Sequence, residues 1–341
     1  MTETDPLAYQ IDIAHPMIHG DIGYGAMTFW RNRNPNGLAP TVQRDDGGEP
    51  WLRLAVAKDA YPGATAGSPE TNDRCELRDD KLPLGTPVSY SFEMRAERGF
   101  PVVDARCVCA QIKAPYYDAD GGSPLFALRI DRGRWVATIE HLYEANDVSF
   151  VDGSEVSDYL TPYRGPGSCG ERVRAFDHHV FGNSPRDFKE LQVRALLATD
   201  GGGLPGHLEG EFRSCTSLVA VTQATALPDD IHEWSRFVVR VAPTSVKNED
   251  GILQLLIVAR ESGEECLIAT ARGEFGHAGY ADPQENTGPA PGAGLQYFKI
   301  GPYRDKLRIW GKGPAAIHVR GIRRDRWDDG AKLRRAANER R

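Results

Sequence analysis

A regular alternation of apolar and polar residues recurs along this chain and limits its fold more than any other feature. In residues 88–95, the apolar side chains Val88, Tyr90, Phe92 and Met94 alternate with polar ones. Successive side chains of a β-strand point to opposite faces, so this pattern predicts a strand with one buried face. The same pattern predicts strands at residues 102–113, 125–130, 135–139, 237–241, 252–259, 297–303, 306–310 and 317–322.

Short turns separate the predicted strands. Asp131-Arg132-Gly133 and Gly311-Lys312-Gly313-Pro314 have the residue types that tight turns require. The chain has 36 Gly and 23 Pro, more than a helical enzyme usually contains. Many strands joined by turns, without the strand–helix rhythm of a parallel sheet, predict an all-β chain of two packed antiparallel sheets, a sandwich or jelly roll.

No shift in composition divides the chain, so residues 1–322 are predicted to form a single domain. Three long irregular segments, near 20–50, 143–187 and 276–296, are rich in turn residues and are expected to be functional walls or lids, or else disordered. Residues 323–341 form a basic, helix-compatible tail, expected to be a solvated terminal helix or a frayed end.

The charge balance excludes several partners. Asp and Glu number 48 and Lys and Arg 41, so a net charge of -7 provides no field that attracts nucleic acid or an anionic membrane. No run approaches the roughly 20 apolar residues that cross a bilayer, and the first residues lack the features of a signal peptide. We expect a soluble monomer, cytoplasmic unless a signal peptide has been removed, in which case it is secreted or periplasmic.

The cysteines do not indicate a disulfide framework. Six cysteines in 341 residues are few, and none forms a Cys-x-x-Cys pair of the kind that binds zinc. Free, buried thiols are therefore expected. Cys107 and Cys109 are two residues apart, so on a strand they share a face and cannot easily bridge each other.

Three predicted strands place polar side chains on one face. The sets that share a face are Arg74, Glu76 and Arg78 in the first strand, Gln111 and Lys113 in the second, and Tyr297, Lys299 and Tyr303 in the third. Each set alone is commonplace, because an alternation of Arg and Glu is most often a solvated ion pair. Alternating charges facing a core would be too costly, however, so Arg74 to Arg78 must face water or a ligand.

Together these segments resemble the motifs of jelly-roll polysaccharide lyases, namely the alginate lyases and their glucuronan and heparin lyase relatives. The matching residues are Arg-x-Glu-x-Arg from Arg74, Gln-Ile-x from Gln111 and Tyr-Phe-Lys-x-Gly-x-Tyr from Tyr297. The resemblance implies a concanavalin-like β-jelly roll whose concave sheet forms a sugar groove. It also implies β-elimination on 4-linked uronate polymers, which leaves an unsaturated sugar end.

The resemblance assigns catalysis to Tyr297, Gln111, Arg74 and Lys113. The proton on C5 lies beside a carboxylate, which Arg74 and Gln111 are suited to neutralise or to hydrogen-bond. Tyr297 matches the family's catalytic tyrosine and is the candidate acid, and the base as well if nearby cations stabilise its phenolate. Lys113 replaces the histidine that the family commonly has, so we expect it to neutralise the carboxylate instead of removing a proton. Either Tyr297 then acts alone, or a histidine from elsewhere in the chain supplies the base.

Further side chains are candidates for binding the polymer. They are Arg78, Lys299, Arg304 and Tyr303, with His179 and His277 as the histidines that a groove could recruit. No cofactor or metal motif occurs, and the sequence leaves open whether calcium supports the fold. Two alternatives remain: a non-catalytic carbohydrate-binding sandwich, and a glycoside hydrolase, which would need two carboxylates in the groove.

Overall fold

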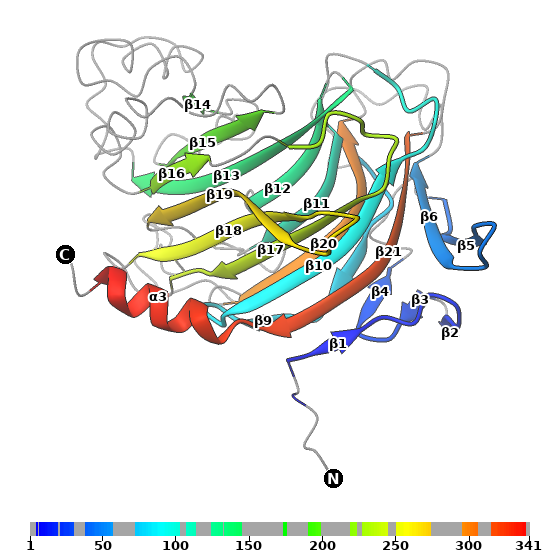
Figure 1. Ribbon diagram of the computed structural model, residues 1–341, viewed down its shortest axis with the longest axis horizontal. Coiled ribbons are helices and arrows are strands. Elements are labelled where there is room, and N and C mark those ends of the chain that lie inside the picture. Colours follow the sequence, from blue (N-terminus) through cyan, green and yellow to red (C-terminus); the bar gives the residue numbers. More distant parts are fainter. Residues whose placement is uncertain are drawn as a thin grey trace.

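The computed structural model describes residues 5, 7–19, 21–30, 38–56, 72–102, 107–113, 124–131, 133–144, 173–175, 190–198, 219–223, 227–244, 250–273, 295–305 and 315–338. Within these ranges the strands form a nine-stranded and a 12-stranded sheet (Figure 1). Within each of these sheets, every described strand pair is antiparallel. The chain is therefore an all-β jelly-roll sandwich, as the alternation predicts.

The nine-stranded sheet contains, in spatial order, β16 (Val219–Gln223), β19 (Glu265–Gly273), β18 (Gly251–Val258), β17 (Ser235–Ala242), β10 (Val88–Ala96), β21 (Ala315–Arg326), β6 (Pro50–Val56) and β5 (Thr41–Arg44), and β1 (Tyr9–Gln10) also pairs with β21. The 12-stranded sheet contains β14 (Val173–Ala175), β15 (Glu190–Ala198), β13 (Arg134–Glu144), β12 (Pro124–Asp131), β11 (Cys107–Lys113), β20 (Leu295–Asp305), β8 (Leu77–Asp79), β4 (Met27–Phe29), β3 (Asp21–Tyr24) and β2 (Met17–His19), and both β7 (Asn72–Arg74) and β9 (Leu82–Pro83) pair with β20.

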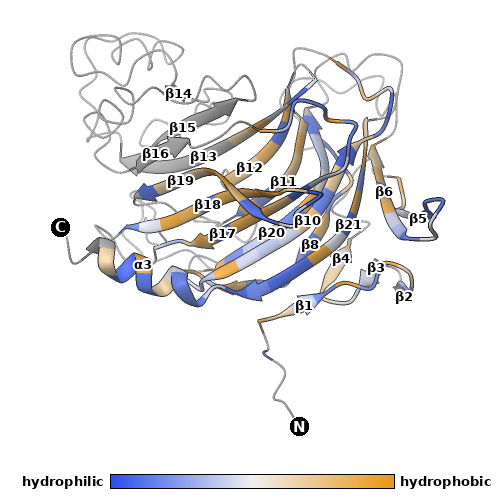
Figure 2. Cartoon of the chain, viewed as in Figure 1, coloured by the Kyte–Doolittle hydropathy of each residue, from blue (hydrophilic) through white to orange (hydrophobic). Residues whose placement is uncertain are grey.

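The apolar residues of each strand pack between the two sheets. Strand β10 is buried at every second position, as its sequence predicts. Phe298 of β20 lies 4.6 Å from Tyr90 and 5.5 Å from Phe92 between ring centroids, so aromatic contacts join the sheets directly. Figure 2 shows hydrophobic residues concentrated along β11, β12, β17 and β18 of both sheets. Burial of these faces fixes the register of the strands.

Eight of the predicted strands coincide with β10, β11, β12, β13, β17, β18, β20 and β21. The strand predicted from residue 102 begins only at Cys107, and Val102 is largely exposed. Residues 306–310 and most of the irregular segments 143–187 and 276–296 lie outside the described residues. Segment 20–50 is mostly described and contains three short strands, so the prediction that it is irregular throughout is wrong. Cys75, Cys107 and Cys109 are free and buried, whereas Cys266 is free but exposed, so that part of the cysteine prediction is wrong.

The C-terminal part of the chain is more firmly attached than its charge suggests. Strand β21 continues through Arg326, so residues 323–326 belong to the sheet. Helix α3 (Asp328–Asn338) follows. Trp327 packs with Ala242 and Ile252, and the Arg334 guanidinium donates to the carbonyls of Gly85 (3.0 Å) and Pro243 (2.8 Å). Within the described parts of the chain, no helix combines the length and apolar character needed to cross a membrane.

A buried ion pair also joins the two sheets. Asp79 of β8 accepts a hydrogen bond from Arg324 of β21 at 2.8 Å and one from the hydroxyl of Tyr90 at 3.2 Å. Burial raises the pKa of Asp79 to about 6, although Arg324 opposes this rise. Burial alone would lower the pKa of Arg324, but the Asp79 carboxylate raises it. Asp79 and Arg324 therefore attract each other, but desolvation of the carboxylate raises the pKa of Asp79 by more than this attraction lowers it.

This pKa predicts how stability depends on pH. Folded Asp79 holds its proton up to about pH 6, whereas the unfolded residue loses it near its ordinary value of 3.8. The contribution of Asp79 is therefore fully present below about pH 4 and is lost as the pH rises through 6, a change of about 3 kcal/mol at most. The free energy of unfolding, measured with urea at several pH values across this range, should fall with rising pH in the parent protein and should not show this fall in Asp79→Asn. Parallel pH profiles would contradict the raised pKa.

Candidate active site

The three segments singled out in the sequence lie side by side in the 12-stranded sheet. Strand β20 is the centre, with β11 on one edge and β7 and β8 on the other. Gln111 lies opposite Lys299, and Lys113 lies opposite Tyr297. On the other side of β20, Lys299 lies opposite Arg78. A row of Arg78, Lys299 and Gln111 therefore crosses three adjacent strands.

These side chains occupy the sheet face that does not contact the core. Phe298 and Ile300 of β20 and Ile112 of β11 belong to the hydrophobic core, and Tyr297 and Lys299, which alternate with the first two, do not. Because neighbouring residues on a strand point to opposite faces, Tyr297, Lys299 and Gln111 share the outer face. We call this surface the Tyr297 face.

Cations surround the Tyr297 ring. The guanidinium carbon of Arg78 lies 4.5 Å from the ring centroid, the ammonium of Lys299 lies 5.6 Å away and that of Lys81 lies 5.9 Å away. Lys113 is its cross-strand neighbour. Positive charge close to a phenol favours its phenolate. The site is thus locally basic within a chain of net charge -7.

Glu76 connects the amide and one of the cations. Its carboxylate accepts a short hydrogen bond from Nε2 of Gln111, and its second oxygen lies 3.7 Å from Nζ of Lys299. All three side chains are nearly buried, with exposed fractions of 5% for Glu76, 3% for Gln111 and 7% for Lys299. Because buried polar groups with satisfied hydrogen bonds hold a fixed geometry, Glu76 orients the Gln111 amide.

The two arginines of the first motif have different neighbours. Arg78 lies against Tyr297, and its guanidinium also lies 5.3 Å from the Trp30 ring. Arg74 is instead paired with Tyr303, whose ring centroid is 4.6 Å from the Arg74 guanidinium. Tyr303 follows Tyr297 by six residues, about 20 Å along a strand. The geometry therefore gives Arg78 the place beside Tyr297 that the sequence assigned to Arg74.

Arg304 does not belong to this face, so the prediction that it binds substrate is wrong. It lies opposite Cys107, which is a core residue. Nε of Arg304 lies 3.1 Å from Oδ2 of Asp73, and the exposed fractions of the two residues are 2% and 3%. Strand alternation turns Arg304 inward, and Asp73 neutralises it there.

Histidines do not complete the described part of the site. His179 and His277 lie outside the described residues. Among the described histidine side chains, His15 contacts Asp12, His232 contacts the carbonyl of Ala96, and His318 contacts Glu97. Among the described residues, no group of three or more His, Cys, Asp or Glu is arranged to hold a metal ion.

Tyr297 has no exposed surface in this arrangement. The three cations close to its ring are on long, flexible side chains: Arg78 belongs to β8, and Lys81 follows that strand by two residues. In this arrangement the phenol is not accessible to a ligand. The sequence placed Tyr297 on a polar face, but it did not indicate that the ring is covered.

Three residues of the site were not among the candidates from the sequence. Glu76 was visible in the Arg-x-Glu-x-Arg alternation, which already placed it on the same face as Arg78. Lys81 follows β8 in the connection to β9, and Trp30 directly follows β4. A single lysine or tryptophan next to a turn gives no periodic signal, so only the fold brings these two to the site.

A closely fitting glycine positions the first motif against β20. Gly301 has φ of 139°, and a Cβ there would overlap the carbonyl oxygen of Cys75 and lie 2.8 Å from Cα of Glu76. We expect Gly301→Ala to lower the free energy of unfolding by at least about 2 kcal/mol, because strain and overlap add. Urea unfolding measures this loss.

Gly25 provides the matched control for that substitution. Its φ is 64°, but a Cβ there meets nothing within 4 Å. Gly25→Ala should therefore cost only the backbone strain, about 1 kcal/mol. Equal losses for the two variants would show that contact with the Cys75–Glu76 backbone does not matter.

Comparisons with known proteins give a limited result. No family model and no curated protein matches the sequence. Among solved structures, an endo-β-1,4-glucuronan lyase from the fungus Trichoderma reesei is 13% identical with a TM-score of 0.45, over 87% of this chain and 90% of that one. An alginate lyase from Klebsiella pneumoniae is 10% identical with a TM-score of 0.40, over 84% and 85% of the two chains. One from a Chlorella virus is 10% identical with a TM-score of 0.39, over 84% and 89%. At these identities and TM-scores, the likeness carries no activity over to this chain.

Proposed function

We propose that this protein is a polysaccharide lyase that cleaves a 4-linked uronate polymer by β-elimination. The observation that carries the proposal is the set of groups around one phenol: Tyr297 with Arg78 and Lys299 beside its ring, Lys113 across the strand pair, and the Gln111 amide next to Lys299. Each group has a chemical task in this reaction.

The first task is to make the C5 proton acidic enough to remove. That proton lies next to a carboxylate, and its loss places a second negative charge on the same group. The guanidinium of Arg78 and the ammonium of Lys299 suit this anion, and the second N–H of the Gln111 amide is available to the developing enediolate. Glu76 acts as a positioning residue, because it accepts the first N–H of that amide.

The second task is proton transfer. A base removes the C5 proton, the electron pair of that bond forms the C4–C5 double bond, and the bond from C4 to the glycosidic oxygen breaks. The departing oxygen then takes a proton. Tyr297 serves as acid to this oxygen, and its cationic surroundings also favour the phenolate that a base requires.

A second candidate function is a non-catalytic carbohydrate-binding sandwich. The specific observation in its favour is the complete burial of Tyr297, because a face that only binds sugar has no need of an accessible phenol. A glycoside hydrolase fits less well. It requires a pair of carboxylates, and the described contacts of Gln111 and Lys299 provide a single one, Glu76.

One experiment separates the three functions. The full chain is incubated with glucuronan, alginate, heparin-type and xanthan-type polymers, with cellulose as the uncharged control. We expect ultraviolet absorbance from the conjugated double bond with at least one polyuronate and none with cellulose. New reducing ends without absorbance would indicate hydrolysis. Retention on a polyuronate column without either signal would indicate a binding module.

A further inference from the structure

The outer face of the nine-stranded sheet carries a second concentration of charged and aromatic side chains. Arg236 of β17 lies opposite Glu93 of β10, which lies opposite Arg320 of β21. In a parallel row, Arg95 lies opposite His318, and His318 lies opposite Arg53. The hydrophobic core separates this surface, which we call the Arg95 face, from the Tyr297 face.

Most cations of the Arg95 face have a carboxylate partner. Arg236 and Arg320 share Glu93 at 2.7 and 2.8 Å, and Arg320 also reaches Asp45 at 3.2 Å. Arg53 pairs with Glu97. Arg95 differs from these residues, because it makes no ion pair with any residue that the structure describes.

Arg95 is nevertheless held in a fixed place. Its guanidinium lies 4.7 Å from the Trp234 ring and 5.7 Å from the Trp51 ring, and Nε donates to Nδ1 of His318 at 3.1 Å. His318 therefore accepts at Nδ1 and donates from Nε2 to Glu97 at 3.2 Å. Burial and the neighbouring Arg320 lower the pKa of Arg95, and the carboxylates of Glu233 and Asp45, which do not form an ion pair with it, oppose this shift. Arg95 is thus a cation without an ion-pair partner among the described residues, held beside two indole rings.

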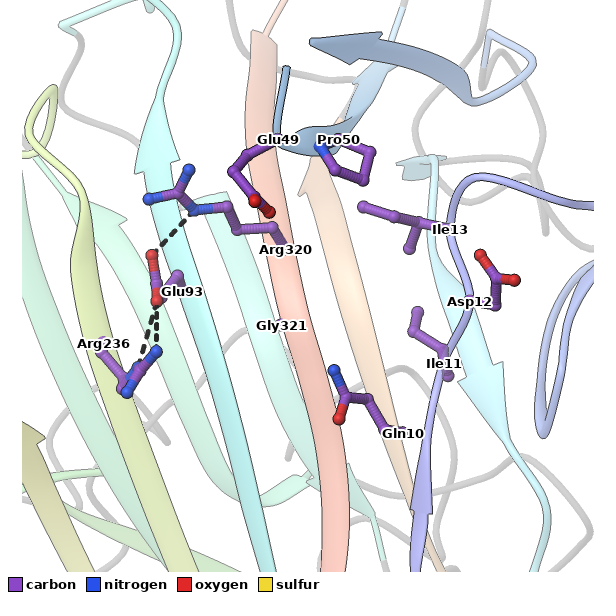
Figure 3. Close-up of a pocket in the computed structure, with 10 residues that line it drawn as sticks. All are labelled: Gln10, Ile11, Asp12, Ile13, Glu49, Pro50, Glu93, Arg236, Arg320 and Gly321. Carbon is purple, nitrogen blue, oxygen red and sulfur yellow. Dashed lines mark hydrogen bonds and ion pairs between the residues drawn. The ribbon is translucent and has the colours of Figure 1, made fainter. Parts of the chain in front are cut away.

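Next to this frame is a cavity of about 610 Å³. It lies along β21, bordered by Gln10–Ile13 on one side, by Glu93 and Arg236 on the other, and by Glu49 and Pro50 at one end (Figure 3). Arg320 belongs to both places, because it lines the cavity and its guanidinium lies 4.5 Å from the Trp234 ring. Gly321 also lines the cavity, and a Cβ there would meet nothing within 4 Å.

The chemistry of the surroundings indicates one kind of occupant. A guanidinium that makes no ion pair within the described residues and lies close to two indole rings suits the planar carboxylate of a ligand. The lining of the cavity combines aliphatic surface from Ile11, Ile13 and Pro50 with the acceptors Asp12 and Glu49. Sugar rings present both hydroxyl donors and apolar C–H faces, which suit such a lining.

We propose that the Arg95 face is a second binding site for an acidic saccharide, in which Arg95 binds a sugar carboxylate and the cavity beside Arg320 accepts a neighbouring sugar ring. The choice of an acidic sugar rests on the proposed function, whereas the anion site itself follows from the contacts of Arg95. The site lies on the opposite side of the sandwich from Tyr297, so it anchors a polymer without taking part in its cleavage.

The test observes the two tryptophans directly. The full chain with Tyr297→Phe, which prevents turnover, is labelled with fluorotryptophan, and the signals of Trp51 and Trp234 are assigned by substitution with Phe. A 4-linked glucuronate tetrasaccharide is titrated against it, with cellotetraose and inorganic phosphate as comparison ligands. We expect a saturable shift of both signals with the glucuronate chain only. No shift, an equal shift with cellotetraose, or equal affinity for phosphate would overturn the proposal.

Variants assign the shift to Arg95. Arg95→Gln should weaken binding at this site by about tenfold or more, and Arg95→Lys, which keeps the charge but not the planar fork, by less. Arg240→Gln removes the same charge from β17, where Arg240 pairs with Glu265, and should change nothing. Arg78→Gln, on the Tyr297 face, should leave the tryptophan shifts unchanged. Equal affinity in Arg95→Gln and in the parent would overturn the proposal.

The two proposals fail separately. Tryptophan shifts without any ultraviolet product would support the second site and contradict the lyase. Ultraviolet product from a protein whose Trp51 and Trp234 signals never move would support the lyase and contradict the second site.

Discussion

Tyr297→Phe should abolish elimination while the protein remains folded and continues to bind the polymer. Only the hydroxyl is removed, so the ring keeps its contacts with Arg78 and Lys299. Loss of a group that transfers protons in the transition state lowers the rate by about 10²–10⁴-fold, and a residue serving as acid and base belongs at the upper end. Initial rates of absorbance increase and retention on immobilised polyuronate measure the two properties.

Tyr303→Phe is the matched control. Tyr303 lies on the same strand but contacts Arg74, and it lies opposite Val108, well away from Lys113. Its hydroxyl has no part in the proposed chemistry, so this variant should keep nearly full activity. Full activity in Tyr297→Phe would remove the phenol from the mechanism, and equal losses in both variants would indicate a general effect on the strand.

Strand alternation was sufficient to predict which residues face the core. It placed Cys75 and Leu77 inside and Tyr297 and Lys299 outside, and the structure has each of them there. The same alternation already turned Arg304 away from Tyr303, so its assignment to the substrate face went against the pattern. Charge alone suggested a binding role, and the buried Asp73 partner explains the charge without one.

Pairing register is the part that alternation does not contain. Moving one strand past another by an even number of residues keeps every side chain on its face, so Arg74 and Arg78, which are four residues apart, were equally suited to lie beside Tyr297. The close approach of Gly301 to Cys75 and Glu76 helps to settle the register, because only a residue without a side chain fits there. The complete burial of Tyr297 was also not predictable, since alternation places the ring on a polar face and does not show what lies above that face.

The register leads to the second large expected effect. Arg78→Gln should lower kcat/KM by about 10²–10³-fold, the usual cost of losing one donor that stabilises a developing oxyanion. Its guanidinium is 4.5 Å from the Tyr297 ring. It is therefore close enough to bind the carboxylate of a sugar whose protons Tyr297 transfers. Glutamine keeps an N–H donor and removes the charge, so the loss reports on electrostatic stabilisation.

Arg74→Gln removes the same charge from the same motif and provides the comparison. Because Arg74 contacts Tyr303, we expect kcat/KM to fall by at most about tenfold. Most of this loss should be a higher KM, caused by weaker attraction of the polymer. Raising the ionic strength should reduce the KM effect of Arg74→Gln, since salt screens the long-range attraction of a polyanion, and should leave most of the kcat effect of Arg78→Gln. A larger loss of kcat in Arg74→Gln than in Arg78→Gln would mean that the substrate carboxylate binds beside Tyr303, and that the reacting sugar does not lie over Tyr297.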